Sequence, residues 1–448
     1  MFSSSRVHDR GRVLFALLFL TAAGSVAAQE PEPSPRPREQ DELDFQGRSS
    51  VLVGSGARAL GMGGAFLARA DDATAASWNP AGLSYLRRPE ISLVGVHSTA
   101  NETTQNATTG FIFGTDRSEG DAPDFLSAAY PVTLGAVSGA IQLSFQRVIS
   151  FTGDRRIQEE LNPLRLVNSR QGFDVLALGT GMKVGAGLRV GVTVNRWFHG
   201  FQQTRERVER RRTFQEVDFE LSGLSVNAGI IWTPVEHLNL GVSGKTPMRG
   251  DVRLSRMRTD FYDEPLVVTQ NAHESRDVRL DLPGAVGVGV SWRPASTLTL
   301  SADYTWTFWS AARIRNYFTL AATPAESPDK PPPPEIFPSL LFPRILDSGQ
   351  NDTAELRAGL EYVLIWRDLR VPLRAGFLTE TQYFRVEGDK APRFSGFSVG
   401  AGIVGGPFLL DVAYLHESGS YVREDPGRTD VTIRRLLFSL IYRHGAGQ

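Results

Sequence analysis

The side chains that most often do chemistry in proteins occur in this sequence, but without the spacing that a catalytic or metal site needs. The seven histidines are scattered, with no pair four residues apart and no HExxH motif to hold a zinc ion. The chain has no cysteine, which excludes disulfides, thiolate metal sites and cysteine nucleophiles. These patterns predict a protein that is not an enzyme and that holds no metal ion.

Two further stretches have the composition of a functional site but not its pattern. The run Gly61-Met-Gly-Gly64 lacks both the GxGxxG spacing and the Lys-Ser/Thr of a phosphate-binding loop, so no cofactor is predicted. Nothing marks the adjacent carboxylates Asp71 and Asp72 as a general acid and base. The formal net charge of −1 gives no electrostatic reason to expect nucleic acid as a partner.

The glycine run and the two carboxylates lie in a compact segment, 54–83, that is rich in glycine and alanine. Three arginines precede the apolar run Val13–Leu20 near the N-terminus, and small residues end at Ala28. This pattern predicts a secretory signal peptide over 1–28. A transmembrane anchor is the alternative, but eight strongly apolar residues are too few to span a bilayer. Residues 29–41 then read as a proline-rich, solvated linker, and 42–88 as a separate N-terminal domain.

Beyond residue 88, apolar and polar residues alternate in long strands, as they do over the 13 residues Thr297–Trp309. A tilted strand needs only ~9–11 residues to cross a membrane, whereas soluble strands usually have ~5–6. The alternation predicts fourteen strands, at about 89–98, 123–132, 136–151, 171–183, 187–201, 213–233, 237–255, 276–293, 297–317, 352–366, 369–381, 394–405, 407–420 and 429–443.

The predicted connections alternate between short turns, such as 184–186, and long loops, such as 99–122 and 318–351. This order is typical of an outer-membrane β-barrel with both termini in the periplasm. We therefore predict an all-β transmembrane barrel of about fourteen antiparallel strands over 89–448, in contact with outer-membrane lipid. A soluble periplasmic β-protein is the alternative, although a soluble fold gives no reason for such an order.

The alternation also assigns side chains to the two faces of the wall. The inner face is predicted to be polar, with inward Gly287, Gly289, Gly400 and Gly402 leaving room in the lumen. If Arg367 and Asp368 form a two-residue turn, Glu361 lies opposite Arg374 as an ion pair inside the barrel. Aromatic residues near the strand ends are predicted to form interfacial girdles: Trp197, Trp232, Trp292, Trp306, Trp309, Trp366, Tyr383, Tyr414 and Tyr442.

Several motifs resemble a known family. They are Gly-Met-Gly-Gly-Ala at 61–65, Ala-Asp-Asp-Ala at 70–73, Asn-Pro-Ala at 79–81, a Leu-Pro hairpin from 280, and the last strand at 437–442. With them the sequence resembles the FadL/OMPP1 (TodX-like) family of outer-membrane transport proteins, over essentially the whole mature chain. The resemblance implies a fourteen-stranded barrel with a small N-terminal hatch in its lumen. It also implies uptake of hydrophobic molecules, such as long-chain fatty acids or hydrocarbons, captured by extracellular loops and released sideways through the wall near the third strand.

The motif residues of the hatch have physical reasons to be there. The glycines permit positive φ and tight packing, Asp71 or Asp72 is suited to cap a helix or pair with an arginine, and Asn79-Pro80 ends a helix. They serve either to fit the hatch into the barrel or to gate it. The candidate gating and hatch residues are Gly61, Gly63, Gly64, Asp71, Asp72, Asn79, Pro80 and Ala81.

One predicted loop contains an unexpected apolar run. Within 318–351 the residues Phe337, Leu340, Leu341 and Phe342 are candidates for ligand capture, with roofing of the barrel as the alternative role. The hatch pattern is also similar to that of PorV-type barrels, which act as adaptors or shuttles for secreted proteins. Uptake of hydrophobic compounds and an adaptor role in secretion are therefore the two functions that the sequence supports.

Overall fold

The computed structural model describes residues 54–445 except 136, 151–152, 160–161, 208–211, 264–265, 273–275, 316–350, 368, 384–390 and 425–426. All of the described residues belong to one compact unit, Gln40–Gln448. The predicted signal peptide, the linker, the first part of the N-terminal domain and the candidate capture residues Phe337, Leu340, Leu341 and Phe342 lie outside them.

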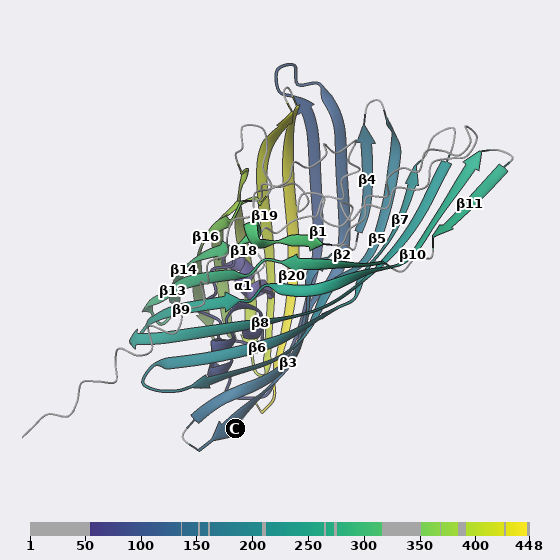
Figure 1. The fold of residues 1–448 in the computed structure, drawn as a ribbon. Coiled ribbons are helices and arrows are strands. Elements are labelled where there is room, and N and C mark those ends of the chain that lie inside the picture. The colour runs from purple at the N-terminus through teal and green to yellow at the C-terminus, as the bar shows by residue number, and fades with distance from the viewer. Residues whose placement is uncertain are drawn as a thin grey trace, which may run out of the picture. The chain divides into compact units, whose positions relative to one another are not determined.

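Twenty strand segments form one sheet, and together they make fourteen wall strands (Figure 1). Nine wall strands are single segments: β1 (Glu90–Asn106), β2 (Ile112–Leu134), β5 (Asn162–Lys183), β8 (Arg212–Val235), β16 (Thr353–Trp366), β17 (Leu369–Thr381), β18 (Arg393–Gly405), β19 (Phe408–Glu424) and β20 (Gly427–Arg443). Five are interrupted: β3 (Val137–Ser150) with β4 (Gly153–Glu159), β6 (Leu188–Phe198) with β7 (Gly200–Arg207), β9 (Leu238–Lys245) with β10 (Met248–Asp263), β11 (Leu266–Ala272) with β12 (Arg276–Leu282) and β13 (Ala285–Ala295), and β14 (Leu298–Thr307) with β15 (Arg313–Arg315).

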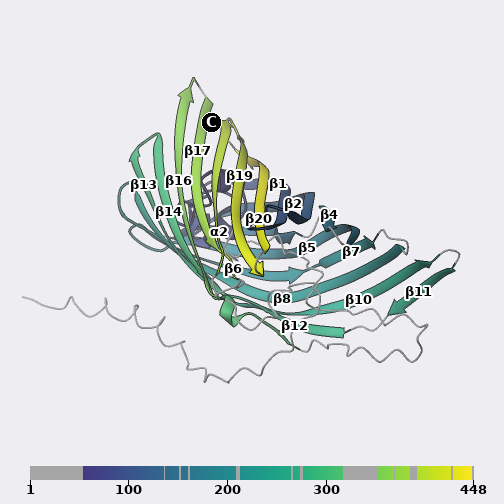
Figure 2. The same ribbon diagram turned by 90° about the horizontal axis from the view of Figure 1, so that it is seen from above.

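The first and last wall strands pair with each other and close the sheet into a barrel. β1 is antiparallel to β2 on one side and to β20 on the other, where Glu90 lies opposite Arg443 and Asn106 opposite Gly427. The other wall strands also pair with their sequence neighbours in antiparallel fashion, and Figure 2 shows the same wall turned by 90°. The predicted fourteen-stranded antiparallel barrel is therefore confirmed.

The strands are longer than the sequence predicted, and most of the predicted long loops are strand. The wall continues through most of 99–122, 152–170, 202–212 and 256–275, and only short connections such as 107–111 remain between the paired ends. These extensions alternate less regularly between apolar and polar residues, because beyond a membrane neither face needs to be apolar. Backbone pairing holds them together without that pattern.

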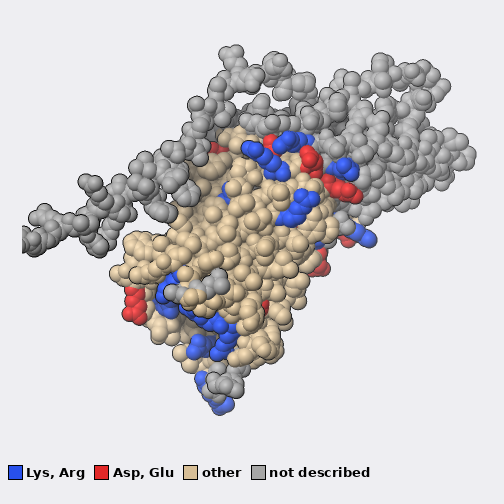
Figure 3. Space-filling view, turned by 60° about the horizontal axis from the view of Figure 1, so that its bottom comes forward, with Lys and Arg blue, Asp and Glu red and all other residues tan. Residues whose placement is uncertain are grey.

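The outer face of the wall is apolar over a broad belt, and Figure 3 shows it as a wide surface with few charges. On β19 and β20 the outward side chains of Leu410, Val412, Phe438 and Leu440 are 37–55% exposed, while the alternate residues are buried. Such a continuous apolar surface is unfavourable in water and is typical of the lipid-facing side of a membrane barrel. Among the described residues, no helix is long and apolar enough to span a membrane.

The chain before β1 forms short helical turns in place of strand. They are α1 (Ala57–Gly61), α2 (Ala75–Trp78) and the 3₁₀ helix η1 (Pro80–Tyr85), and a further 3₁₀ turn, η2 (Trp309–Ala311), interrupts the wall. Asn79 ends α2 in an extended conformation and accepts a hydrogen bond from Ala81 N, so that Pro80 begins η1. This is the break that Asn-Pro predicts, because the residue before proline avoids the helical region.

The closed wall has a consequence that a gel can test. Because each of the fourteen wall strands pairs with both of its neighbours over at least part of its length, the folded barrel is expected to resist unfolding by sodium dodecyl sulfate at room temperature. The unheated protein should therefore migrate differently from the boiled protein, and it should fractionate with outer membranes. Identical mobility before and after boiling, together with a soluble periplasmic location, would contradict the membrane barrel.

Candidate functional site

Residues 54–86, here called the inner segment, lie within the ring of strands and are bonded to inward-facing side chains of the wall (Figures 1 and 2). Wall side chains satisfy main-chain groups that short helical turns leave unpaired. The bonds run from Ala57 N to Ser439 Oγ (2.7 Å), Gly63 N to Ser398 Oγ (2.8 Å), Phe66 N and Leu67 N to Asp303 Oδ2 (2.6 and 2.8 Å), and Gln142 Nε2 to Ala73 O (2.6 Å). They come from strands all around the barrel, so the inner segment is held on every side.

Inward glycines of the wall make room for the inner segment. At Gly376 an added Cβ would lie 2.1 Å from Gly63 N, and at Gly229 it would lie 1.9 Å from Asn79 Oδ1. The glycines that face the inner segment in this way are Gly181, Gly191, Gly229, Gly241, Gly289, Gly359, Gly376 and Gly400. Of the four glycines singled out in the sequence, Gly289 and Gly400 belong to this set, whereas Gly402 makes room for the side chain of Asp411.

The structure gives different surroundings to the candidate hatch residues. Gly63 and Gly64 have positive φ values of 66° and 78°, a conformation that other residues rarely adopt. Gly61 lies against Gly400, and Gly64 against Arg357 and Trp78. The amide of Asn79 donates to three carbonyl oxygens, of Leu67 (2.9 Å), Ile230 (3.2 Å) and Val242 (3.3 Å). Asn79 thus ties two parts of the inner segment to the wall, and Pro80 and Ala81 are buried beside it.

A cluster of charged side chains joins the inner segment to β16, β17 and β19. Arg58 lies 2.7 Å from Asp71, 3.1 Å from Asp72 and 3.2 Å from Glu361, and Arg69 binds Asp71 and Glu361. Glu361 lies opposite Arg374 in the ladder, 2.8 Å away, and Arg374 also binds Asp411 at 2.6 Å. The four residues proposed from the sequence, Asp71, Asp72, Glu361 and Arg374, therefore meet in one network.

The two aspartates of this cluster have different partners. Asp72 is buried, and its Oδ1 accepts hydrogen bonds from Thr74 N (2.9 Å) and Thr74 Oγ1 (2.7 Å), so it shapes the backbone before α2. Burial raises the pKa of Asp71, but the charges of Arg58 and Arg69 outweigh burial and hold that pKa below its ordinary value. Arg58 and Arg69 were not singled out in the sequence, although they are the only basic residues of 54–83.

A second group of inward side chains, the lumen cluster, is apolar. Residues predicted to make the inner face polar, such as Asp303, Glu361 and Arg374, are buried inside the wall, so the inner face is polar in one part and apolar in another. It contains Ala100, Phe173, Val175, Ala177, Trp197, Leu221, Met248, Leu280, Leu282, Trp309, Ala312, Tyr383, Phe394, Tyr421, Val431 and Ile433. Trp197, Trp309 and Tyr383 are at most 3% exposed, so these three are not part of an interfacial girdle. Trp309 stacks on Tyr383 at 4.3 Å, and Trp197 Nε1 donates to Ser225 Oγ at 2.8 Å.

The wall ladder is interrupted beside the lumen cluster. β2 pairs with β3 up to Phe125 opposite Gln146, and β2 pairs with β4 from Glu119 opposite Asp154. Between these points the regular β2–β3 and β2–β4 ladders are interrupted, while β2 stays paired with β1. Pro123 lies in this stretch of β2, where its missing N–H removes one donor.

Bulges flank the interruption on both sides. The β1–β2 register shifts between Val94 and Gly95, and the β3–β5 register shifts between Arg147 and Ile149. A bulge turns two successive residues to one side of a strand. The neighbours Val148 and Ile149 both pack against the lumen cluster, as such a bulge allows. The inner side of the interruption is therefore lined by the apolar side chains of Val148 and Ile149, here called its inner lip.

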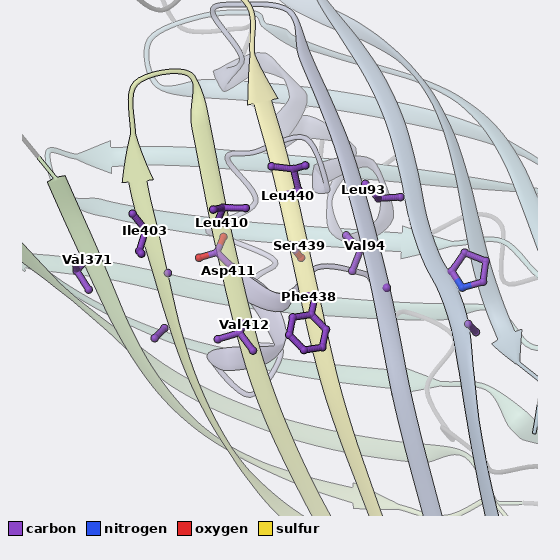
Figure 4. Close-up of a pocket in the computed structure, with 15 residues that line it drawn as sticks. Leu93, Val94, Val371, Ile403, Leu410, Asp411, Val412, Phe438, Ser439 and Leu440 are labelled. Atoms are coloured by element: carbon purple, nitrogen blue, oxygen red, sulfur yellow. The ribbon is translucent and has the colours of Figure 1, made fainter.

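An apolar groove of about 770 Å³ lies on the wall over β17–β20, β1 and β2. Figure 4 shows Ile403, Leu410, Phe438 and Leu93 on neighbouring strands around it. The groove ends at Ala122 and Pro123, which lie where the β2–β3 ladder is interrupted. An apolar path along the outer surface thus begins at the wall interruption.

Solved structures share this architecture at low sequence identity. A FadL homologue of Pseudomonas aeruginosa superposes with a TM-score of 0.59 at 13% identity, covering 87% of this chain and 98% of the other. This chain has the FadL-type fold. The toluene transporter TbuX of Ralstonia pickettii matches it with a TM-score of 0.53 at 14% identity (88% and 99% covered), and the toluene transporter TodX of P. putida with 0.53 at 13% (88% and 99%). No protein-family model and no curated protein matches the sequence.

Two of the three matched structures are named as toluene transporters, and none of the three is named as an enzyme. The identities are too low to transfer individual residues. What the comparison adds is independent support for the fourteen-stranded wall, since nearly the whole of each matched chain is covered.

Because the wall glycines lie so close to the inner segment, replacing one of them by alanine is expected to destabilise the barrel. In Gly241→Ala the new Cβ would lie 2.7 Å from Leu67 O and 2.8 Å from Ala68 Cα. Because both atoms are main chain, the inner segment must shift, and the free energy of unfolding is expected to fall by about 1–3 kcal/mol. Gly244→Ala on the same strand is the matched control, since its nearest neighbour is 3.9 Å away. Denaturant titration in liposomes measures both variants, and equal stability would contradict the fit.

Proposed function

We propose that the protein is an outer-membrane channel for the uptake of hydrophobic compounds, such as long-chain fatty acids or hydrocarbons. The observation that carries this proposal is the lumen cluster, an apolar region inside a polar-lined barrel that reaches the wall interruption through Val148 and Ile149. A pore for water-soluble solutes gains nothing from such a lining, whereas an apolar ligand gains free energy from it. The matched structures include proteins named as toluene transporters.

In this proposal the inner segment acts as a hatch that closes the barrel. It spans the lumen between strands on opposite sides, from Ser439 of β20 to Asn239 of β9. The charged cluster around Arg58 and Glu361 and the bonds of Asn79 anchor it, which supports a closing role for the candidate hatch residues. A ligand held in the lumen cluster then has no direct path through the centre of the barrel.

The proposed exit is lateral, through the wall interruption between β2 and β3. The ligand moves from the lumen cluster past Val148 and Ile149 and reaches the membrane beside Pro123, where the outer groove begins. This route keeps an apolar molecule among apolar side chains throughout, which avoids the cost of crossing the polar hatch. The end of the barrel that carries the short turns and the β1–β20 pair Glu90–Arg443 is proposed to face the periplasm, with both termini.

Capture from outside is proposed to involve the apolar run of the predicted long loop. Phe337, Leu340, Leu341 and Phe342 are the candidates, and they stay a prediction from the sequence alone. In the sequence they lie between β15 and β16.

Uptake by cells tests the proposal directly. Cells that produce the protein should take up labelled oleate or toluene faster than cells that lack it, because the lumen cluster offers an apolar path across the barrier. If cells with and without the protein took up each compound at the same rate, the result would contradict transport. If a secreted protein also accumulated in the cells that lack this barrel, the result would favour the PorV-like adaptor function.

The lateral route predicts a specific sensitivity at the inner lip of the wall interruption. Val148→Arg introduces a charge among apolar side chains and should lower uptake by about tenfold, since an apolar ligand must then pass a group that needs water or a partner. Val148→Leu keeps the lip apolar at similar size and should leave uptake near that of the parent. Both variants are compared at equal amounts of folded barrel. A normal rate in Val148→Arg would contradict exit at this point.

A further inference from the structure

Three cations gather at the short-turn end of the barrel, where the inner segment leads into β1. Arg87 follows the inner segment, and its Nη1 lies 3.4 Å from Ser138 Oγ on β3. Ser138 lies opposite Lys183 at the end of β5, and Lys183 lies opposite Arg189 on β6. Directly opposed residues of neighbouring strands have Cβ atoms only about 4.5–5.5 Å apart. Arg87, Lys183 and Arg189 therefore form one group, here called the basic cluster.

The wall residues of the basic cluster lie on the inner face. Gly181, two residues before Lys183 on β5, faces the inner segment. Gly191, two residues after Arg189 on β6, faces it as well. Residues two apart on a strand share one face, so Lys183 and Arg189 are directed inward. The guanidinium of Arg189 lies 4.0 Å from the ring centre of Tyr85 in η1, which places the cluster between the wall and the end of the inner segment.

The positive charge of the basic cluster is not neutralised within the part of the chain that the structure describes. Arg87, Lys183 and Arg189 form no ion pair there. The two arginines donate hydrogen bonds to the neutral hydroxyl groups of Ser138 and Thr233, at 3.4 and 3.3 Å. Like charges directly opposite each other destabilise a sheet. An anion among the three cations would replace this repulsion by attraction.

Two buried polar atoms in the same place have no hydrogen-bond partner among the described residues, Tyr85 Oη and Arg189 Nε. A buried donor without an acceptor costs free energy, so both atoms are expected to bind an acceptor. Buried arginines elsewhere in the lumen, Arg374 and Arg435, each bind a carboxylate. Positive charge and free donors at one place are what an oxyanion requires, because hydrogen bonds between charged partners are the strongest.

We propose that the basic cluster and Tyr85 form a binding site for an oxyanion, a phosphate or carboxylate group that enters from the aqueous side at the short-turn end. Tyr85 belongs to the inner segment and Arg87 follows it directly, whereas Lys183 and Arg189 belong to the wall. A bound anion therefore bridges the two and stabilises their contact. The site goes beyond the proposed uptake of hydrophobic compounds, since neither the lumen cluster nor the wall interruption takes part in it.

Two sources offer such a group. One is free phosphate in the surrounding solution. The other is the chain itself, because Asp41, Glu42 and Asp44 form an acidic run in the sequence shortly before the inner segment. Both sources supply negatively charged oxygen atoms, so a competition between them tells which one occupies the site.

Titration calorimetry with inorganic phosphate measures the site in the mature barrel in phosphatidylcholine nanodiscs. Lys183→Gln and Arg87→Gln should each weaken phosphate binding by about tenfold, because each removes one charged donor. Both side chains are exposed, so these variants are expected to fold. Phosphate should also raise the midpoint of denaturant unfolding of the parent more than that of either variant, since a bound anion ties the inner segment to the wall.

Two further variants are matched controls. Lys183→Arg keeps the charge and should bind phosphate nearly as tightly as the parent does. Arg293→Gln removes an exposed arginine at the same end of the barrel but outside the basic cluster, so its affinity for phosphate should equal that of the parent.

The combined variant Asp41→Asn, Glu42→Gln and Asp44→Asn distinguishes the two sources. If the acidic run occupies the site, this variant should bind phosphate about tenfold more tightly than the parent, because the competing carboxylates are gone. Equal affinity assigns the site to free phosphate. The site would be overturned if neither the parent nor the combined variant bound phosphate. It would also be overturned if Lys183→Gln and Arg87→Gln bound phosphate as tightly as the parent.

Discussion

The backbone of a strand in a membrane must find its hydrogen bonds on neighbouring strands, because lipid offers none. Fourteen wall strands meet this requirement by pairing in a closed ring in which β20 returns to β1. Closure at this size leaves a lumen that is wider than the side chains of the wall can fill. The inner segment and the side chains of the lumen cluster occupy this space, and the wall glycines make room for the inner segment.

The inner face of the wall differs between two parts of the lumen, because the groups that it contacts there differ. At the level of the inner segment, short turns expose main-chain donors and acceptors, and wall serine, asparagine, glutamine and aspartate side chains bond to them. Wall glycines make room there, and apolar wall residues such as Phe125 and Leu437 pack against the inner segment. The lumen cluster contains no residue of the inner segment, and the wall turns Trp197, Trp309 and Tyr383 inward there. The same inner face therefore supplies the hydrogen bonds to the inner segment and the apolar side chains of the lumen cluster.

The β2–β3 seam is one of several places where the wall ladder is interrupted. Pro123 cannot donate there, and bulges at Val94–Gly95 and Arg147–Ile149 lie on both sides of it. The apolar neighbours Val148 and Ile149 link this place to the lumen cluster. The wall thus combines a closed ring of paired strands with local interruptions of the ladder, and this interruption lies beside the lumen cluster.

The sequence by itself determined the number and order of the strands and the side of the wall on which most of their residues lie. Each strand has its own alternation of apolar and polar residues, so this can be predicted strand by strand. It also placed Glu361 opposite Arg374, since a two-residue turn between Trp366 and Leu369 leaves one register. Other features required the fold. The length of the strands beyond the membrane was underestimated, because pairing continues there without an apolar pattern. The lumen cluster was also missed. Each strand contributes only a few residues to it, so no pattern within one strand predicts the cluster.

Only the tertiary structure decided which charges meet and where the wall opens. Arg58, Arg69 and Asp411 join Glu361 because the inner segment is laid across strands that lie some three hundred residues away in the chain. Arg147, Asp174 and His199 come from three wall strands and have no common spacing in the sequence. Alternation along one strand fixes the face on which a side chain lies. Its partner across the lumen or the seam depends on how the ring closes, and that is a property of the whole barrel.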